Sequence, residues 1–187
     1  TLFITLPSAL LFVAIIGAFT ALFAATIAIT QTEMKKILAY STISQLGYMM
    51  LALGAASLTA SMFHLMTHAF FKALLFLGAG CVLHAMHNEA SIWKYGGLKK
   101  YMPVTYWTFL IACLAIAGIF PFAGFFSKDL ILEVTFAASS FSGHAYGPFQ
   151  AVYSVLFIMA VLTAFLTAFY MFRMYFICFH GELRSKE

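Results

Sequence analysis

Residues 61–83 read SMFHLMTHAFFKALLFLGAGCVL, and this stretch decides the fold class. It is apolar over a length that crosses the roughly 30 Å hydrocarbon core of a bilayer as one α-helix. Membrane β-barrel strands are much shorter and alternate strictly between apolar and polar residues, which this stretch does not. The stretch therefore predicts a membrane-spanning helix with Lys72 near its middle.

The composition of the whole chain agrees with a membrane protein. Of its 187 residues, 64% are hydrophobic and only 9% are charged, whereas soluble domains have about 25% charged residues. Apolar runs occupy residues 2–29, 37–58, 61–83, 104–138 and 149–179. We therefore expect an all-α, polytopic, single membrane domain over residues 1–187, with about five transmembrane helices.

The fourth run is too long for one crossing. Residues 104–138 would extend about 52 Å as a straight helix, against a core of about 30 Å. Residues 118–124 read GIFPFAG, and proline with paired glycines can break a helix. Broken spanning helices line protected cavities and mark ion sites. We expect the fourth helix to be discontinuous near residues 121–124.

Polar residues follow this interruption. Ser127 is a preferred N-cap for a second half-helix, which puts Asp129 in the first turn, where negative charge suits the positive helix end. Glu133 lies one turn further on. Spacing alone leaves open a second interpretation, in which an unbroken helix carries Lys128 to the membrane surface.

Basic residues predict the orientation, because cytoplasmic loops carry the excess of Lys and Arg. The turn near Thr59 and the linker 139–148 have none. The other connections and the C-terminal end carry Lys35, Lys36, Lys94, Lys99, Lys100, Arg173, Arg184 and Lys186. We expect the N-terminal end outside and the C-terminal end in the cytoplasm.

Three ionisable residues form a row in the third run. His64, His68 and Lys72 are four residues apart, so they share one helix face at steps of about 6 Å. A central lysine costs about 2.5–3.5 kcal/mol on insertion scales and normally faces a bundle interior or a hydrated path. Histidine titrates near neutral pH. The row therefore predicts a proton relay.

Other roles for the row stay open. Either histidine could be an interhelical hydrogen-bond partner, and Lys72 could belong to a structural ion pair. A haem or metal site is disfavoured, because the Lys72 cation would oppose a metal ion. The stripe also has no carboxylate or cysteine to complete a ligand set.

Two further polar sets flank the row. They are Ser41, Ser44, Gln45 and Tyr48 in the second run, and His84, His87 and Glu89 after the third. The first set could hold water beside the row or serve helix packing. The second could collect protons at a channel mouth or belong to a solvated loop.

Several motifs resemble a known family. Residues 31–48, QTEMKKILAYSTISQLGY, resemble the signature of antiporter-like subunits of respiratory complex I. Residues 64–77, HLMTHAFFKALLFL, with the motifs at 96–98, 123–129 and 172–174, resemble chain L of NADH:quinone oxidoreductase, the counterpart of mitochondrial subunit 5. The resemblance covers essentially the whole chain. It implies a fragment holding the second of two inverted five-helix repeats, and the start at Thr1 also suggests an internal piece.

The resemblance implies roles for the site residues. His64, His68 and Lys72 match the central hydrophilic axis of the family, and Lys128 matches the lysine at the broken helix that leads outward. Asp129 and Glu133 would tune Lys128. Protons would reach Lys72 through His84 or buried water, and Ser44 would support the path.

The resemblance also implies partners and cofactors. We expect no cofactor in this chain; NAD, FMN, iron–sulfur clusters and quinone would be bound by partner subunits. The partners would be other complex I membrane subunits and lipid, in a bacterial plasma membrane rather than a mitochondrial inner membrane. The scattered basic residues do not suggest nucleic acid.

Two other functions remain open from the sequence. A subunit of a multi-subunit sodium/proton antiporter or of a membrane-bound hydrogenase would share the lysine pattern. A structural membrane anchor, for example one holding a haem, would not need a lysine at mid-membrane.

Overall fold

The computed structural model describes residues 6–140 and 149–184 of the chain. These residues form six α-helices and one 3-10 turn, and no strand is found among them. The elements are α1 (Pro7–Thr30), α2 (Met34–Gly54), α3 (Leu58–Ala85), η2 (Ile92–Lys94), α4 (Pro103–Ala117), α5 (Ala123–Ser140) and α6 (Gln150–Phe179). The predicted all-α membrane fold with a discontinuous fourth helix is confirmed.

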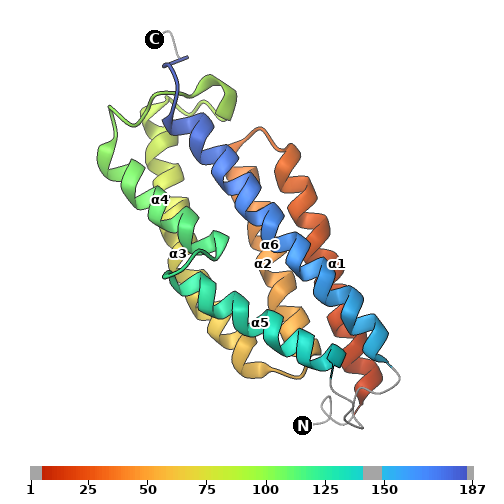
Figure 1. Cartoon of the computed structure of the whole chain (residues 1–187). Helices are drawn as coiled ribbons and strands as arrows, with labels where there is room; N and C mark the ends of the chain where they lie inside the picture. Colours follow the sequence, from red (N-terminus) through yellow and green to blue (C-terminus); the bar gives the residue numbers. More distant parts are fainter. Residues whose placement is uncertain (1–5, 141–148, 185–187) are drawn as a thin grey trace.

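Four of these helices, α1, α2, α3 and α6, are long and apolar enough to cross a membrane. The helix α4 has 15 residues and is only about 22 Å long. It is therefore too short to cross a core of about 30 Å by itself. Figure 1 shows the chain leaving α4 about half-way along the bundle and continuing as α5 to the opposite end. The two short helices together make one crossing.

Two glycines shape the interruption between α4 and α5. Gly118 ends α4 in the left-handed conformation, with φ of 78°, which favours glycine. Gly124 lies against the end of α4, where an added Cβ would be 1.8 Å from the Ala115 carbonyl oxygen. The first glycine lets the chain turn, and the second lets α5 approach α4 closely.

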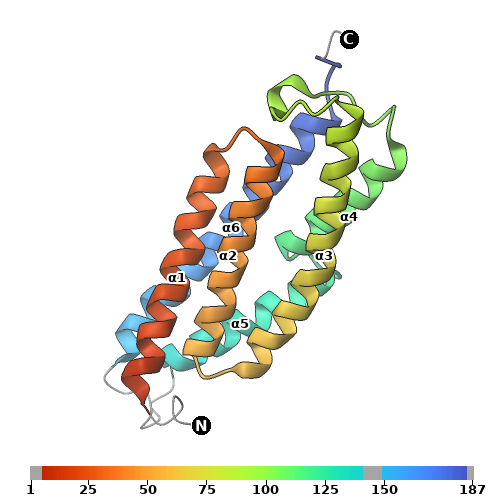
Figure 2. The ribbon, with the colours of Figure 1, turned by 180° about the vertical axis from the view of Figure 1, so that it is seen from behind.

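The helices α1 and α2 form a closely packed antiparallel pair (Figure 2). Small residues allow this approach, as is usual for membrane helices. A Cβ at Gly47 would lie 2.5 Å from the Ala21 backbone nitrogen. The helix α6 crosses the pair, and the Arg173 guanidinium donates hydrogen bonds to the carbonyl oxygens of Ile29 and Gln31. This contact satisfies carbonyl groups at the end of α1.

Three connections gather at one end of the bundle. The α1–α2 connection, the segment between α3 and α4, and the end of α6 lie together in Figures 1 and 2. An isolated bridge between Glu33 and Ser91 joins the first two, and the Gly97 amide donates to the His180 carbonyl at the third. We call this the lysine-rich end, because the predicted basic connections meet there.

The apolar core divides into two clusters. One gathers around Leu75, Phe109 and Tyr175 toward the lysine-rich end. The other gathers around Ala60, Ile131 and Tyr153 toward the opposite end. Many large apolar side chains outside these clusters are exposed, which suits a surface facing lipid. Along α3, His64 and His68 lie between Ala60 of the second cluster and Phe71 of the first, and Lys72 follows Phe71.

Some expected boundaries differ from the structure. The helix α3 extends beyond 61–83 at both ends. At its start, the Ser57 hydroxyl accepts a hydrogen bond from the Ala60 amide and caps the helix earlier than expected. The interruption covers residues 118–122. Residues 2–5 of the first run, most of the 139–148 linker and Lys186 lie outside the described residues.

Candidate functional site

The row on α3 faces the interior of the bundle. His64, His68 and Lys72 are all buried. The imidazole centroids of His64 and His68 are 6.2 Å apart, which matches the rise of one helical turn. The neighbouring positions Leu65 and Ala69 are exposed. The helix therefore places its ionisable side chains on its buried face.

Lys72 binds to α2 through its ammonium group. Its Nζ donates to the Leu38 carbonyl oxygen at 2.9 Å and to the Ser41 hydroxyl. The Ser41 hydroxyl in turn donates to the same carbonyl at 2.8 Å. Among the described residues, no carboxylate lies within ion-pair distance of Lys72. Neutral oxygens alone hold this amine, so no fixed carboxylate keeps a proton on it.

Lys128 binds to the broken end of α4. It is buried on α5, and its Nζ donates to the Ile116 carbonyl oxygen at 2.5 Å. The helix ends at Ala117, so this carbonyl lies at the negative end of the α4 dipole. Gly118 leaves room for the lysine, since a Cβ there would lie 3.3 Å from Lys128 Cδ. The structure excludes the interpretation in which an unbroken helix carries Lys128 to the surface.

His64 connects the α3 row to Lys128. Its Nε2 lies 3.0 Å from Gln45 Oε1, and its Nδ1 lies 2.9 Å from the Ser127 hydroxyl. The Gln45 oxygen accepts, so Nε2 carries a hydrogen and Nδ1 accepts from Ser127. Thr67 donates to the Ser127 hydroxyl at 3.1 Å. Ser127 precedes Lys128 in the chain, so hydrogen bonds link His64 to the residue beside the second lysine.

His68 lies between Lys72 and His64. Its Nε2 is buried and has no hydrogen-bond partner among the described residues. Its ring meets Phe71 edge to face at 5.4 Å between centroids. Buried polar atoms of this kind are normally satisfied by internal water. The site is therefore a line of two lysines and two histidines, in which His68 Nε2 has no partner among the described residues.

The role expected for Ser127 as a helix cap is wrong. The helix α5 begins at Ala123, one turn earlier than expected. Ser127 lies inside the helix and donates toward His64 instead. The first turn holds no acidic residue, so Asp129 does not occupy it. The earlier start occurs because Gly124 can pack directly on the end of α4.

The supporting residues lie apart from the row. Asp129 and Glu133 are exposed on the outer side of α5, and His84 is exposed near the end of α3. Ser44 is buried but donates to the Ala21 carbonyl oxygen at 2.8 Å. That bond ties α2 to α1. The structure therefore brings Lys72, His68, His64 and Lys128 together, but not these four residues.

Two contacts of the site were not anticipated. The Ile116 carbonyl is a backbone group freed by the break, and no sequence pattern marks it. Thr67 does carry a signal, because it is three residues from His64 and adjacent to His68. Tyr48, which belongs to the polar set expected beside the row, faces the site as well: Lys128 Nζ lies 5.7 Å from its ring centroid.

Comparisons with known proteins identify relatives of this architecture. Residues 1–154 match the family described as NADH:quinone oxidoreductase/Mrp antiporter, transmembrane. NADH-quinone oxidoreductase subunit L of Rickettsia bellii is 50% identical over 97% of this chain and 26% of the relative. NAD(P)H-quinone oxidoreductase chain 5 of a Picosynechococcus species is 51% identical over 97% of this chain and 26% of the relative.

A solved structure shares the fold. It is that of the Mrp complex from Dietzia sp. DQ12-45-1b, which is 27% identical, with a TM-score of 0.79 over 92% of this chain and 30% of that chain. The chain spans about a quarter of the length of the curated relatives that it matches.

Proposed function

Because the chain belongs to the NADH:quinone oxidoreductase/Mrp antiporter family, we propose that it is part of a proton-translocating subunit of an NADH:quinone oxidoreductase. The observation that carries this proposal is the buried line from Lys72 through His68 and His64 to Lys128. Titratable groups inside a membrane are costly and mark ion or proton paths. The chain's relatives at about 50% identity are subunits of quinone oxidoreductases.

The mechanism moves a proton between the two lysines. The Lys72 amine takes up a proton from water and then releases it toward His68. The imidazole centroids are 6.2 Å apart, so transfer between the histidines would need a bridging water, for which the unpartnered His68 Nε2 is the available partner. Ser127 connects His64 to Lys128, and Lys128 releases the proton on the other side of the membrane. No bond other than those to hydrogen changes in this chain.

The energy for this transfer comes from outside the chain. Quinone reduction elsewhere in the parent complex would change the electrostatic environment of Lys72. NAD, FMN, iron–sulfur clusters and quinone would be held by partner subunits, and other membrane subunits and lipid would surround this chain. In the described part of the chain, no three His, Cys, Asp or Glu residues group as metal ligands would.

The proposed orientation places the lysine-rich end in the cytoplasm, according to the positive-inside rule. The start of α1 and the end of α5 then lie at the outer surface of the membrane. The membrane itself would be a bacterial plasma membrane. Lys72 would take up protons from the cytoplasmic side, and Lys128 would lead outward.

A test of this function replaces Lys72 with methionine in the parent complex. Methionine keeps the length of the side chain and removes the protonatable group. NADH-driven proton uptake into inverted membrane vesicles should be lost, at equal amounts of assembled complex. Lys35→Met is the matched control, because Lys35 is exposed. Normal pumping by Lys72→Met would show that Lys72 is structural.

The second candidate function is sodium/proton antiport. It is favoured by the backbone similarity to the Mrp complex, although the sequence identity to the quinone oxidoreductases is higher. Sodium-dependent transport without NADH oxidation in the same vesicles would support antiport.

A further inference from the structure

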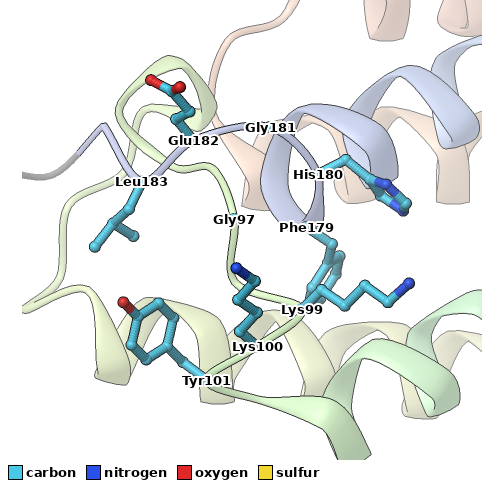
Figure 3. A pocket seen from close by; sticks show the side chains of 9 residues that line it. All are labelled: Gly97, Lys99, Lys100, Tyr101, Phe179, His180, Gly181, Glu182 and Leu183. Atoms are coloured by element: carbon cyan, nitrogen blue, oxygen red, sulfur yellow. The ribbon is translucent and has the colours of Figure 1, made fainter.

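A pocket opens at the lysine-rich end of the bundle (Figure 3). It has a volume of about 340 Å³ and lies between the segment before α4 and the chain that follows α6. Lys99, Lys100 and His180 contribute basic groups to it. Figure 3 shows the Glu182 carboxylate pointing away from the lysine ammonium groups. The pocket is therefore an opening lined by basic residues, and Figure 3 shows the His180 imidazole on the side of Lys99, away from Tyr101 and Leu183.

His180 leads from this pocket into the protein. Its Nε2 lies 3.4 Å from the hydroxyl of Tyr106, a buried residue of α4. Lys99 Nζ lies 4.9 Å from the centroid of the same tyrosine ring. The ring of Tyr106 then meets that of Tyr175 on α6, with centroids 5.4 Å apart. A titratable group at the surface thus contacts a pair of buried tyrosines.

Two buried tyrosine hydroxyls continue inward without satisfied hydrogen bonds. Tyr175 and Tyr170 are 1% and 0% exposed, and neither hydroxyl forms a hydrogen bond of normal geometry within the described residues. Buried tyrosine hydroxyls usually find partners. Those without a protein partner are satisfied by internal water. Phenylalanine would fill the same space without this cost, and the chain uses it at 22 positions.

The last tyrosine reaches the site already described. The Tyr170 hydroxyl faces Ser41, and the Ser41 hydroxyl accepts a hydrogen bond from Lys72 Nζ. The rings of His180 and Tyr175 are 5.8 Å apart between centroids. Tyr170 lies five residues before Tyr175, about 7.5 Å along α6 and about 140° around the helix axis, so the step between these two hydroxyls would need bridging water. The polar groups therefore extend from the pocket to Lys72 through the apolar cluster around Phe109.

We propose that His180, Tyr106, Tyr175 and Tyr170 form a proton-uptake route from this pocket to Lys72. The inference rests on the proposed function and adds to it the path by which Lys72 is reloaded. A proton from bulk water binds the His180 imidazole. Each hydroxyl and bridging water then accepts one proton on its oxygen as it passes its own to the next group. The neutral Lys72 amine takes the last proton, and every relay group ends unchanged.

The test measures NADH-driven proton uptake in inverted vesicles that contain the parent complex. Tyr175→Phe should slow pumping by about tenfold, because one hydrogen-bonding step is lost. His180→Ala should slow it similarly, and imidazole added to the vesicles should restore it through the pocket. Tyr101→Phe is the control: this tyrosine lines the same pocket but is exposed, and its loss should leave pumping unchanged.

The outcomes separate this inference from the function on which it rests. If Lys72→Met does not pump while Tyr175→Phe and His180→Ala pump protons at the normal rate, the route is overturned and the proposed function stays intact. Normal pumping by Lys72→Met overturns both. The route is also overturned if His180→Ala pumps slowly, added imidazole does not restore its rate, and Tyr175→Phe pumps at the normal rate. His180 would then affect pumping only through the structure of the protein.

Discussion

The close approach of Gly124 to the Ala115 carbonyl at the helix break predicts the effect of a larger side chain there. Replacing Gly124 with alanine places a Cβ 1.8 Å from the Ala115 carbonyl oxygen, far inside van der Waals contact. The atom that it meets is backbone, so α4 and α5 must separate. Overpacking of this kind costs about 1–3 kcal/mol, and we expect the upper half of that range because no side chain can rotate away.

A native cysteine reports this separation. Cys113 is fully buried on α4, a short distance before Ala115. A maleimide can label it only when α4 moves away from its neighbours. A loss of about 2 kcal/mol in the free energy of that opening speeds labelling by roughly 30-fold. Mass spectrometry of the labelled peptide separates Cys113 from the exposed Cys81.

Gly80 supplies the control. An added Cβ at this helical glycine meets nothing within 4 Å, so Gly80→Ala should keep or raise stability by about 0.5–1 kcal/mol. Its Cys113 labelling rate should match that of the parent protein. Equal labelling rates for Gly124→Ala and Gly80→Ala would falsify the close packing of α5 on α4.

Two further predictions concern single hydrogen bonds. Ser127→Ala removes the hydroxyl that joins His64, and pumping should slow by about tenfold, whereas Thr135→Val on the same helix should pump normally. Outside the spans, the hydrogen bond from Lys94 holds the pKa of Glu89 below its ordinary value. The pairing therefore exists above that pKa and is lost as pH falls; Lys94→Gln should raise the pKa of Glu89 in an infrared titration, and an unchanged value would contradict the pairing.

The spans and the row were predictable because each depends on a local pattern. Hydropathy over about 20 residues identifies a crossing, and four-residue spacing puts His64, His68 and Lys72 on one face. The break in the fourth run was also visible, since a single helix of that length exceeds the membrane. These inferences need only residue order and helix geometry.

Other features depend on contacts between distant segments. The start of α5 moved one turn earlier than the Ser127 signal indicated, because Gly124 packs on α4 and a polar cap was not required. The Ile116 carbonyl became a partner of Lys128 only through the turn at Gly118. His180 was not expected to matter, since it lies far in sequence from Tyr106 and beyond the last apolar run.

The break in the fourth helix explains why the second lysine can be buried inside the bundle. A continuous helix would bond the Ile116 carbonyl to an amide four residues later. The break frees that oxygen, and Lys128 Nζ donates to it at 2.5 Å. Lys72 is held in the same way, by the Leu38 carbonyl and a serine hydroxyl. Both amines are thus held by neutral oxygens, which can bind an ammonium group without trapping its proton as a carboxylate would.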